Sequence, residues 1–186
     1  MTRLGIFFGT ETGRTRRLAK QIAQRLADDH GVPVDTPANI GRTSVDDFLA
    51  CDAFILGTPT LGEGELPGLD TGLAQPSWAE FLPGLPAGAL TGKTVAIFGL
   101  GDQEKYPEHF VDAIGLLYDA LTALGARAVG RWPTAGYTFT GSVAVDGDDF
   151  LGLAIDPHAQ AGQTDARVDA WLARVVPELV NVKEGV

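Results

Sequence analysis

Three short apolar segments constrain the fold of this chain more than any other feature. Residues 4–8 (LGIFF), 53–56 (AFIL) and 94–98 (TVAIF) lack the alternating polar positions of a half-exposed strand, and each runs directly into a glycine. A strand that is apolar on both faces must be covered on both faces, which is typical of parallel strands between two layers of helices. The pattern therefore predicts parallel strands at the centre of an α/β fold.

Amphipathic segments alternate with these apolar segments. Apolar residues recur at a helical spacing over residues 18–27, 110–124 and 168–176. We expect a weak edge strand at residues 32–34 and a fifth strand within residues 126–132. Alternation of strands and helices predicts a doubly wound, five-stranded parallel sheet.

The length and composition of the chain suit one domain, residues 1–186, with one hydrophobic core. A net charge of -10 disfavours nucleic acid and anionic membranes, since phosphate contacts need a basic surface, and it favours partners with basic docking surfaces. Cys51 is the only cysteine, so an internal disulfide is excluded and a reducing compartment is expected. Without a signal-peptide core or an apolar run of about 18 residues, the chain is expected to be cytoplasmic, with no membrane partner.

The segment after the first apolar run is rich in hydroxyl groups and glycine, and it leads into a helical pattern. A helix N-terminus offers unpaired N–H groups and the positive end of the helix dipole, and small residues let a phosphate approach them. The segment lacks the Walker A and G-x-G-x-x-G motifs, and the alternative is that Thr12 only caps the helix. The predicted phosphate-binding residues are Thr10, Glu11, Thr12, Gly13, Arg14 and Thr15.

Two further loops make this pattern specific. Residues 58–67 (TPTLGEGELP) follow the second apolar run, and residues 98–103 (FGLGDQ), with Tyr106 beyond them, follow the third. In this order the three loops resemble those of flavodoxins, over essentially the whole chain. The resemblance implies the flavodoxin strand order 2-1-3-4-5, with FMN bound non-covalently at the switch point between strands one and three.

A long segment in the last third of the chain indicates which group of flavodoxins the chain resembles. Residues 133–149 exceed an ordinary connection and resemble the insertion that interrupts the fifth strand of long-chain flavodoxins, with the strand resuming in residues 150–156. Its role stays open between partner docking and a decoration that finishes the sheet edge. Residues 60–68 (TLGEGELPG), followed by residues 78–83 (WAEFLP), are most similar to the flavodoxins that supply nitrogenase.

By resemblance, the second and third loops enclose the flavin ring. The Gly62–Glu63 peptide stands where relatives turn a carbonyl toward the flavin N5 on reduction, and glycine makes that turn easy. Leu61 and Tyr106 are expected to form an aliphatic and an aromatic wall of the ring site. The other expected cofactor-binding residues of these loops are Thr58, Pro59, Thr60, Gly64, Gly99, Leu100, Gly101 and Asp102.

Two further residues are assigned to the site with an explicit alternative for each. His109 stands where relatives often carry asparagine, and the alternative is an exposed histidine at the start of a helix. Asp156 ends the resumed strand and is placed to reach the ribityl chain, and the alternative is an ordinary turn residue at the end of a strand.

Acidic residues are concentrated in the same loops. A charge run is usually a solvated surface. Here these residues surround a flavin that becomes anionic when fully reduced. Their charge therefore also predicts a low reduction potential for the step from semiquinone to hydroquinone. The same field favours redox partners with basic docking faces. The resemblance implies that these are a flavodoxin reductase and the nitrogenase iron protein. The residues are Glu63, Glu65, Asp70, Asp102, Glu104, Glu108 and Asp112.

The leading hypothesis is a monomeric low-potential one-electron carrier that cycles its FMN between semiquinone and hydroquinone and is not an enzyme. The sequence shows no nucleophile set and no histidines at metal-ligand spacing. The alternative is an FMN-dependent NAD(P)H:quinone reductase on the same fold, since Leu61 leaves room over the ring. A response-regulator-like domain is disfavoured, because Gly9 and Thr10 stand where its acidic pair is expected.

Overall fold

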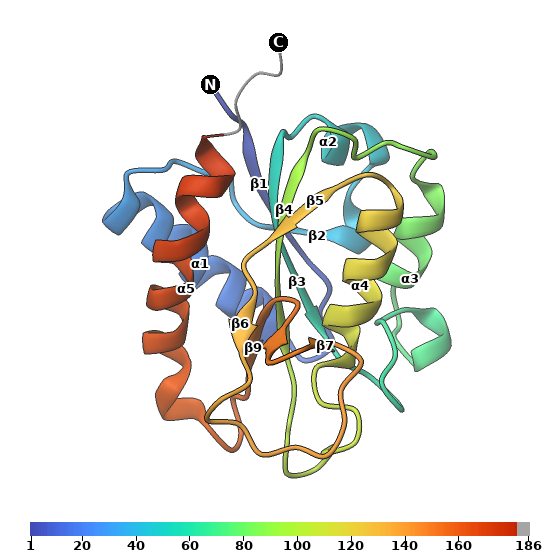
Figure 1. Cartoon of the computed structure of the whole chain (residues 1–186). Helices are drawn as coiled ribbons and strands as arrows, with labels where there is room; N and C mark the ends of the chain where they lie inside the picture. Colours follow the sequence, from blue (N-terminus) through green and yellow to red (C-terminus); the bar gives the residue numbers. More distant parts are fainter. Residues whose placement is uncertain (182–186) are drawn as a thin grey trace.

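The computed structural model describes residues 1–181 and is organised around one twisted parallel sheet (Figure 1). The strand order is β2-β1-β3-β4-β5, and β9 also pairs with β4; all of these pairings are parallel. The predicted order 2-1-3-4-5 is confirmed. The strands are β1 (Leu4–Phe8), β2 (Ala38–Asn39), β3 (Ala53–Pro59), β4 (Thr94–Leu100), β5 (Arg127–Val129) and β9 (Leu153–Ile155).

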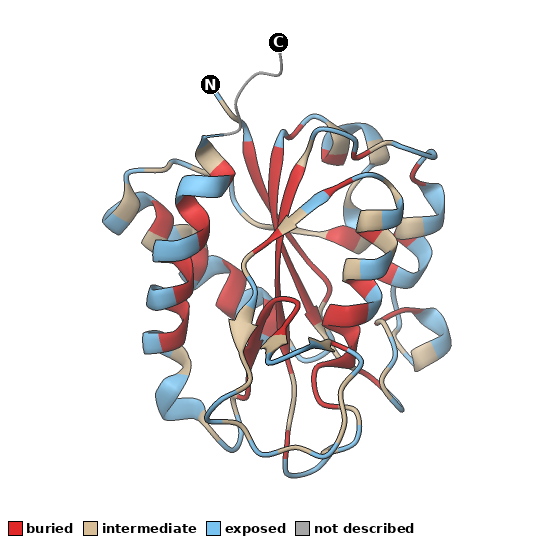
Figure 2. Cartoon of the chain, in the orientation of Figure 1, coloured by how far each residue is buried: buried red, intermediate tan, exposed pale blue. Residues whose placement is uncertain are grey.

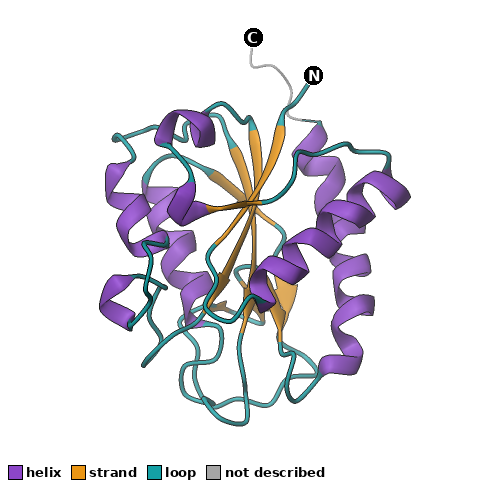
Figure 3. Cartoon of the chain, turned by 180° about the vertical axis from the view of Figure 1, so that it is seen from behind, coloured by secondary structure: helices purple, strands orange, loops and turns teal. Residues whose placement is uncertain are grey.

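Helices cover both faces of this sheet. Helices α1 and α5 lie on one face, and α2, α3 and α4 lie on the other (Figures 1 and 3). No helix in residues 1–181 is long and apolar enough to span a membrane. The helices are α1 (Arg14–His30), α2 (Val45–Leu49), α3 (Trp78–Phe81), α4 (Asp112–Ala123) and α5 (Thr164–Val180), with short 3-10 turns at Ile40–Arg42, Leu69–Thr71, Leu82–Gly84 and Ala161–Gln163.

The central strands are buried along their length, except for the half-buried Pro59 at the end of β3, which explains their lack of alternating polar positions (Figure 2). Successive side chains of a strand point to opposite faces. Ile6 packs with Leu18 and Trp171 on the α1 and α5 side, whereas Phe7 contacts Phe48 on the α2 side, with ring centres 4.9 Å apart. Two hydrophobic cores therefore hold the sheet between its helical layers.

The edge strand lies later in the chain than the sequence predicted. Strand β2 is Ala38–Asn39, with Ala38 beside Phe7, and residues 32–34 do not join the sheet. Val32 and Val34 pack instead, partly buried, against the core on the α1 side. Pro33 separates them and has no N–H to donate to a neighbouring strand. The prediction of a strand at residues 32–34 is therefore wrong.

The fifth strand is split, as the sequence predicted. Strand β5 pairs with the first half of β4 and β9 with the second half, along the same edge. The segment between them contains a small antiparallel sheet of order β6-β8-β7. Its strands are β6 (Trp132–Pro133), β7 (Val145–Asp146) and β8 (Asp149–Phe150), so Phe150 belongs to the insertion and the resumed strand starts later, at Leu153.

Tyr137 anchors this insertion to the main sheet. Its ring packs against Phe110 and Phe150, the Arg167 guanidinium lies 3.9 Å from the ring centre, and its hydroxyl donates to the carbonyl of Ala154 at 2.6 Å. Burial raises the pKa of Tyr137 to about 12, although Arg167 acts in the opposite direction. The hydroxyl therefore stays protonated at neutral pH and keeps this hydrogen bond.

Candidate functional site

The three predicted loops meet at the carboxyl edge of the sheet, opposite the two termini (Figure 1). They leave β1, β3 and β4, which are neighbours in the sheet, with Phe8 beside Gly57 and Thr58 beside Gly99. The N–H of Gly9 donates to the carbonyl of Gly57 at 3.0 Å. Ligands of open α/β sheets bind at such an edge, where the direction of winding changes.

The first loop ends in the N-terminus of α1. Gly13 is the N-cap residue, in the left-handed region with φ of 84°, and its N–H donates to Thr10 Oγ1 at 3.0 Å. No side chain in residues 1–181 caps this helix, so Thr12 does not have the capping role of the alternative interpretation. The N–H groups of the first turn thus remain available to an anion. Arg14 is exposed, and its guanidinium contacts the ring of His158.

Three observations fit a phosphate-bearing ligand at this loop. A Cβ added to Gly13 would meet no atom within 4 Å, so the loop is open on that side. Ser77 Oγ is buried without a hydrogen-bond partner in the described part of the chain, and a Cβ added to Gly9 would lie 2.6 Å from it. A hollow of about 520 Å³, lined by Thr10, Gly13 and residues 73–77 among others, adjoins the loop. A larger hollow of about 1070 Å³ lies at the amino ends of the strands, away from all three loops, so volume alone does not mark the site.

The second loop forms a tight turn. The N–H groups of Gly64 and Glu65 both donate to the carbonyl of Leu61, at 3.1 and 2.7 Å, and the N–H of Leu61 donates to the carbonyl of Glu65 at 3.0 Å. Gly62 and Gly64 have φ of 53° and 92°, which glycine adopts without steric cost. Leu61 is buried, whereas Gly62 and Glu63 are exposed at the tip of the turn.

Asp156 holds the third loop in place. Its carboxylate is 1% exposed; one oxygen accepts from the backbone N–H and the side-chain amide of Gln103, at 3.0 and 2.8 Å, and the other accepts from the N–H groups of His158 and Ala159, both at 2.9 Å. Burial opposes ionisation, but these hydrogen bonds outweigh it and lower the pKa of Asp156. Because the carboxylate is already bonded to protein donors, the geometry favours the alternative that Asp156 is a turn residue at the end of its strand, rather than a residue that contacts a ribityl chain.

The same loop presents an aromatic ring to the surface. Tyr106 is 48% exposed, and its N–H donates to the carbonyl of Asp102 at 2.9 Å. The Asp102 carboxylate accepts from the N–H groups of Glu104 and Lys105, at 3.2 and 2.9 Å, and so stabilises its own turn. An exposed ring on this loop is suited to stacking on a planar ligand.

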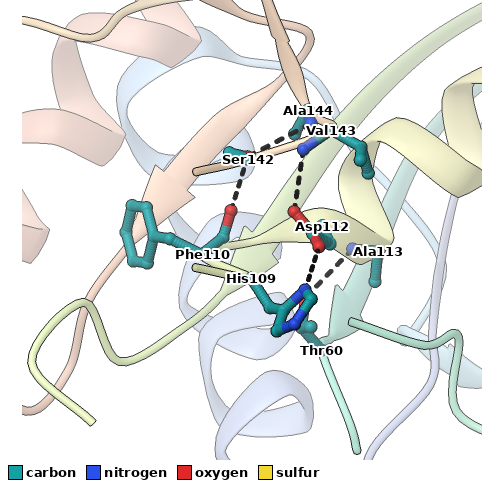
Figure 4. Close-up of polar contacts among 8 residues, drawn as sticks. All are labelled: Thr60, His109, Phe110, Asp112, Ala113, Ser142, Val143 and Ala144. Carbon is teal, nitrogen blue, oxygen red and sulfur yellow. Dashed lines mark hydrogen bonds and ion pairs between the residues drawn. The ribbon is translucent and has the colours of Figure 1, made fainter. Parts of the chain in front are cut away.

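The surroundings of His109 and Asp112 in the structure differ from those expected from the sequence (Figure 4). His109 lies three residues before α4 rather than at its start, is only half exposed, and has its Nδ1 3.0 Å from Asp112 Oδ2. Asp112 is one of the seven acidic residues expected around the flavin, but it is 3% exposed and also accepts from the N–H of Val143 at 2.8 Å. The other six acidic residues of that group are exposed or half buried.

The remaining predicted residues lie on the same three loops or at the strand ends beneath them. Thr60 Oγ1 accepts from the N–H of Ala113 at 3.0 Å, which joins the second loop to α4. Burial varies among the others: Thr15, Thr58, Gly99 and Leu100 are buried, Pro59 and Gly101 are half buried, and Glu11 is exposed.

Comparison with known proteins decides the family. A family model described as flavodoxin matches residues 6–171. The chain belongs to the flavodoxin family. A flavodoxin of Klebsiella pneumoniae is 51% identical over 175 residues, covering 94% of this chain and 97% of that one. A flavodoxin of Enterobacter agglomerans is 45% identical over 181 residues, covering 97% and 100%. The crystal structure of Fusobacterium nucleatum flavodoxin bound to flavin mononucleotide matches with a TM-score of 0.82 at 29% identity, covering 96% and 99%.

This flavodoxin is therefore an electron-transfer protein, and the predicted long-chain flavodoxin fold is confirmed. Three structural links to the site were not predicted: the place of Ser77 beside the first loop, the buried bonds of Gln103 to Asp156, and the burial of Asp112. Ser77 has the sequence signal of a helix cap, S-x-x-E, and Gln103 closes a recognised loop motif without a signal for its buried bonds to Asp156. The burial of Asp112 had one weak signal, its place at the start of a helical pattern, where a carboxylate is favourable.

Proposed function

We propose that this flavodoxin binds FMN non-covalently at its three loops and carries single electrons at low potential, using the couple between half-reduced and fully reduced flavin. The convergence of the loops at the carboxyl edge of the sheet, with an uncapped helix N-terminus, is the observation that carries the proposal. Residues 10–15 would bind the phosphate, and Leu61 and Tyr106 would flank the ring. FMN supplies the one-electron chemistry; the protein binds it, orients it and sets its electrostatic surroundings.

A reductive titration of the purified protein tests this proposal. We expect one FMN per chain and a half-reduced flavin that accumulates over a wide range of potential. A colourless protein that does not bind added FMN would contradict the proposal. Rapid direct reduction by NADPH in stopped-flow mixing would instead support the quinone reductase alternative.

The acidic loops support a low potential. Glu63, Glu104 and Glu108 are exposed in or near the second and third loops. Residues 10–15 contain no lysine, and their one arginine, Arg14, contacts His158. A phosphate bound mainly by neutral N–H and hydroxyl groups would keep most of its own charge. An electron added to the flavin would therefore enter a negative field, which disfavours the fully reduced anion.

Neutralising one of these charges should raise the reduction potential of the couple between half-reduced and fully reduced flavin. Glu63→Gln should raise it by on the order of 20 mV, since a unit charge about 10 Å away in a medium like water contributes an energy of that size. Spectroelectrochemical titration measures the shift, which should shrink as salt increases. Asp28→Asn is the matched control, because Asp28 is exposed near the far end of α1, at the opposite edge of the sheet. An equal shift in both variants would contradict a local effect of Glu63.

We further propose that the partners are redox proteins with basic docking faces, a flavodoxin reductase as donor and the nitrogenase iron protein as acceptor, and that this flavodoxin acts as a cytoplasmic monomer. The sequence TLGEGELPG at residues 60–68 and the exposed acidic residues support this choice. Oxidation of the prereduced protein on mixing with nitrogenase iron protein measures the transfer. Transfer that fails with this acceptor but occurs with other redox proteins would contradict only the nitrogenase assignment.

A further inference from the structure

The turn at residues 61–65 rests directly on the start of helix α4. A Cβ added to Gly64 would collide with Asp112 Oδ2 and lie 3.0 Å from His109 Nδ1, so the backbone of Gly64 packs against this pair. On the other side of the turn, Thr60 accepts a hydrogen bond from the N–H of Ala113 at 3.0 Å. Asp112 and Ala113, two consecutive residues of α4, therefore contact both ends of the turn that bears Gly62 and Glu63. Figure 4 shows the contact of Ala113 with Thr60.

The same carboxylate also holds the insertion. Asp112 Oδ1 accepts from the N–H of Val143 at 2.8 Å, while Oδ2 lies 3.0 Å from His109 Nδ1. Next to this bond, the hydroxyl of Ser142 donates to the carbonyl of Phe110 at 2.6 Å (Figure 4). Hydrogen bonds to a charged acceptor are stronger than those to a neutral one. One buried side chain thus joins the turn, the start of α4 and the insertion.

The backbone between these contacts is strained. Val111 has φ of 50°, a left-handed conformation that a β-branched residue rarely adopts, and it is fully buried. Such a conformation persists only where the surrounding structure holds it. The residues on either side of it, Phe110 and Asp112, are the two that Ser142 and Val143 bind. The insertion therefore fixes the entry into α4 on both sides of the strained residue.

We propose that Asp112 is a positioning residue through which the insertion sets the geometry of the turn at residues 61–65. This inference rests on the proposed placement of FMN beside that turn. It gives residues 133–149 a role inside the molecule: they hold the start of α4, α4 holds the turn through Asp112 and Ala113, and the turn faces the cofactor. Asp112 itself does not touch the cofactor.

A charge-conserving substitution separates position from electrostatics. Asp112→Glu keeps the negative charge and displaces the carboxylate by one methylene, in a space already closed by Gly64. We expect FMN affinity of the apo-protein to fall at least tenfold and the potential of the last electron to shift. Asp119→Glu, at an exposed position two turns along α4, is the matched control and should leave both unchanged. An Asp112→Glu protein that is less stable but has unchanged affinity and potential would overturn the proposal.

A double-mutant cycle tests the same contact without relying on that variant. Gly64→Ala should weaken FMN binding more in the wild-type background than in an Asp112→Ala background, where the colliding carboxylate is removed. Equal fold-changes in the two backgrounds would overturn the proposal.

Amide hydrogen exchange in the apo-protein provides a readout that does not depend on FMN. Asp112→Ala should accelerate exchange at both Val143 and Gly64, because both lose the side chain that they share. Faster exchange at Val143 alone would overturn the proposal that Asp112 couples the insertion to the turn at residues 61–65. If the wild-type apo-protein does not bind FMN, the proposed function fails, whereas the exchange result still decides whether Asp112 couples the insertion to the turn.

Discussion

Replacing Asp156 with alanine should lower the free energy of unfolding of the apo-protein by about 3 kcal/mol, because it removes an ionised acceptor and leaves four N–H donors without this partner, two of them in the buried Gln103. The donors that lose their acceptor belong to Gln103, His158 and Ala159. The loop of residues 101–103 would lose its fixed position, so FMN affinity should fall as well. Chemical denaturation of the apo-protein measures the loss of stability, and fluorescence titration with FMN measures the loss of affinity.

Asp156→Asn provides the control, since it preserves the shape of the side chain and removes its charge. The folded state lowers the pKa of Asp156, so the ionised carboxylate contributes stability above its unfolded pKa, about 4, and this contribution is lost as the pH falls through the folded value. The stability difference between wild type and Asp156→Asn should therefore be largest at neutral pH and decrease below about pH 4. A difference that stays constant from pH 7 to pH 3 would show that this carboxylate is not the source.

The parts of the fold that were predictable from sequence are those in which burial leaves a regular pattern. Strands β1, β3 and β4 are covered on both faces, so the apolar segments at residues 4–8, 53–56 and 94–98 could not be mistaken for exposed structure. Strand β2 has only two residues at the sheet edge, both half buried, and such a strand leaves no pattern to read. The valines on either side of Pro33 had a stronger strand pattern but pack as a loop.

For the site, residues in continuous loops were predictable, and residues defined by distant contacts were not. The loops at residues 10–15 and 58–64 follow predicted parallel strands, and the ends of such strands meet at one edge. Asp112 and the exposed Glu108 are both carboxylates near the start of α4, and Asp112 is bound by the N–H of Val143, which lies 31 residues further along the chain. Ser77 lies near Gly9 only because Trp78 packs beneath the first two loops. Such three-dimensional neighbours have no signature in local sequence.

Trp78 should give the largest loss of stability on substitution. Its side chain is fully buried, packs edge-on against Phe81 at 6.2 Å between ring centres, and donates from Nε1 to the carbonyl of Gly57 at 2.9 Å. The same carbonyl accepts from the N–H of Gly9, so Trp78 supports the point where the first and second loops leave the sheet. Trp78→Ala should lower the free energy of unfolding by about 4 kcal/mol, the cost of a large cavity in a core. Denaturation of the apo-protein measures it.

Trp78→Phe divides this effect into its two physical parts. Phenylalanine keeps most of the ring contact with Phe81 but cannot donate to Gly57, so the expected loss is about 1–2 kcal/mol, close to that of one unmade buried hydrogen bond together with a modest reduction in volume. Because Gly57 leads directly into Thr58 and the second loop, FMN affinity should fall in this variant even where the fold is retained. If Trp78→Phe lost stability but bound FMN as tightly as wild type, the indole would serve only the core, and the two loops would take their geometry from the sheet alone.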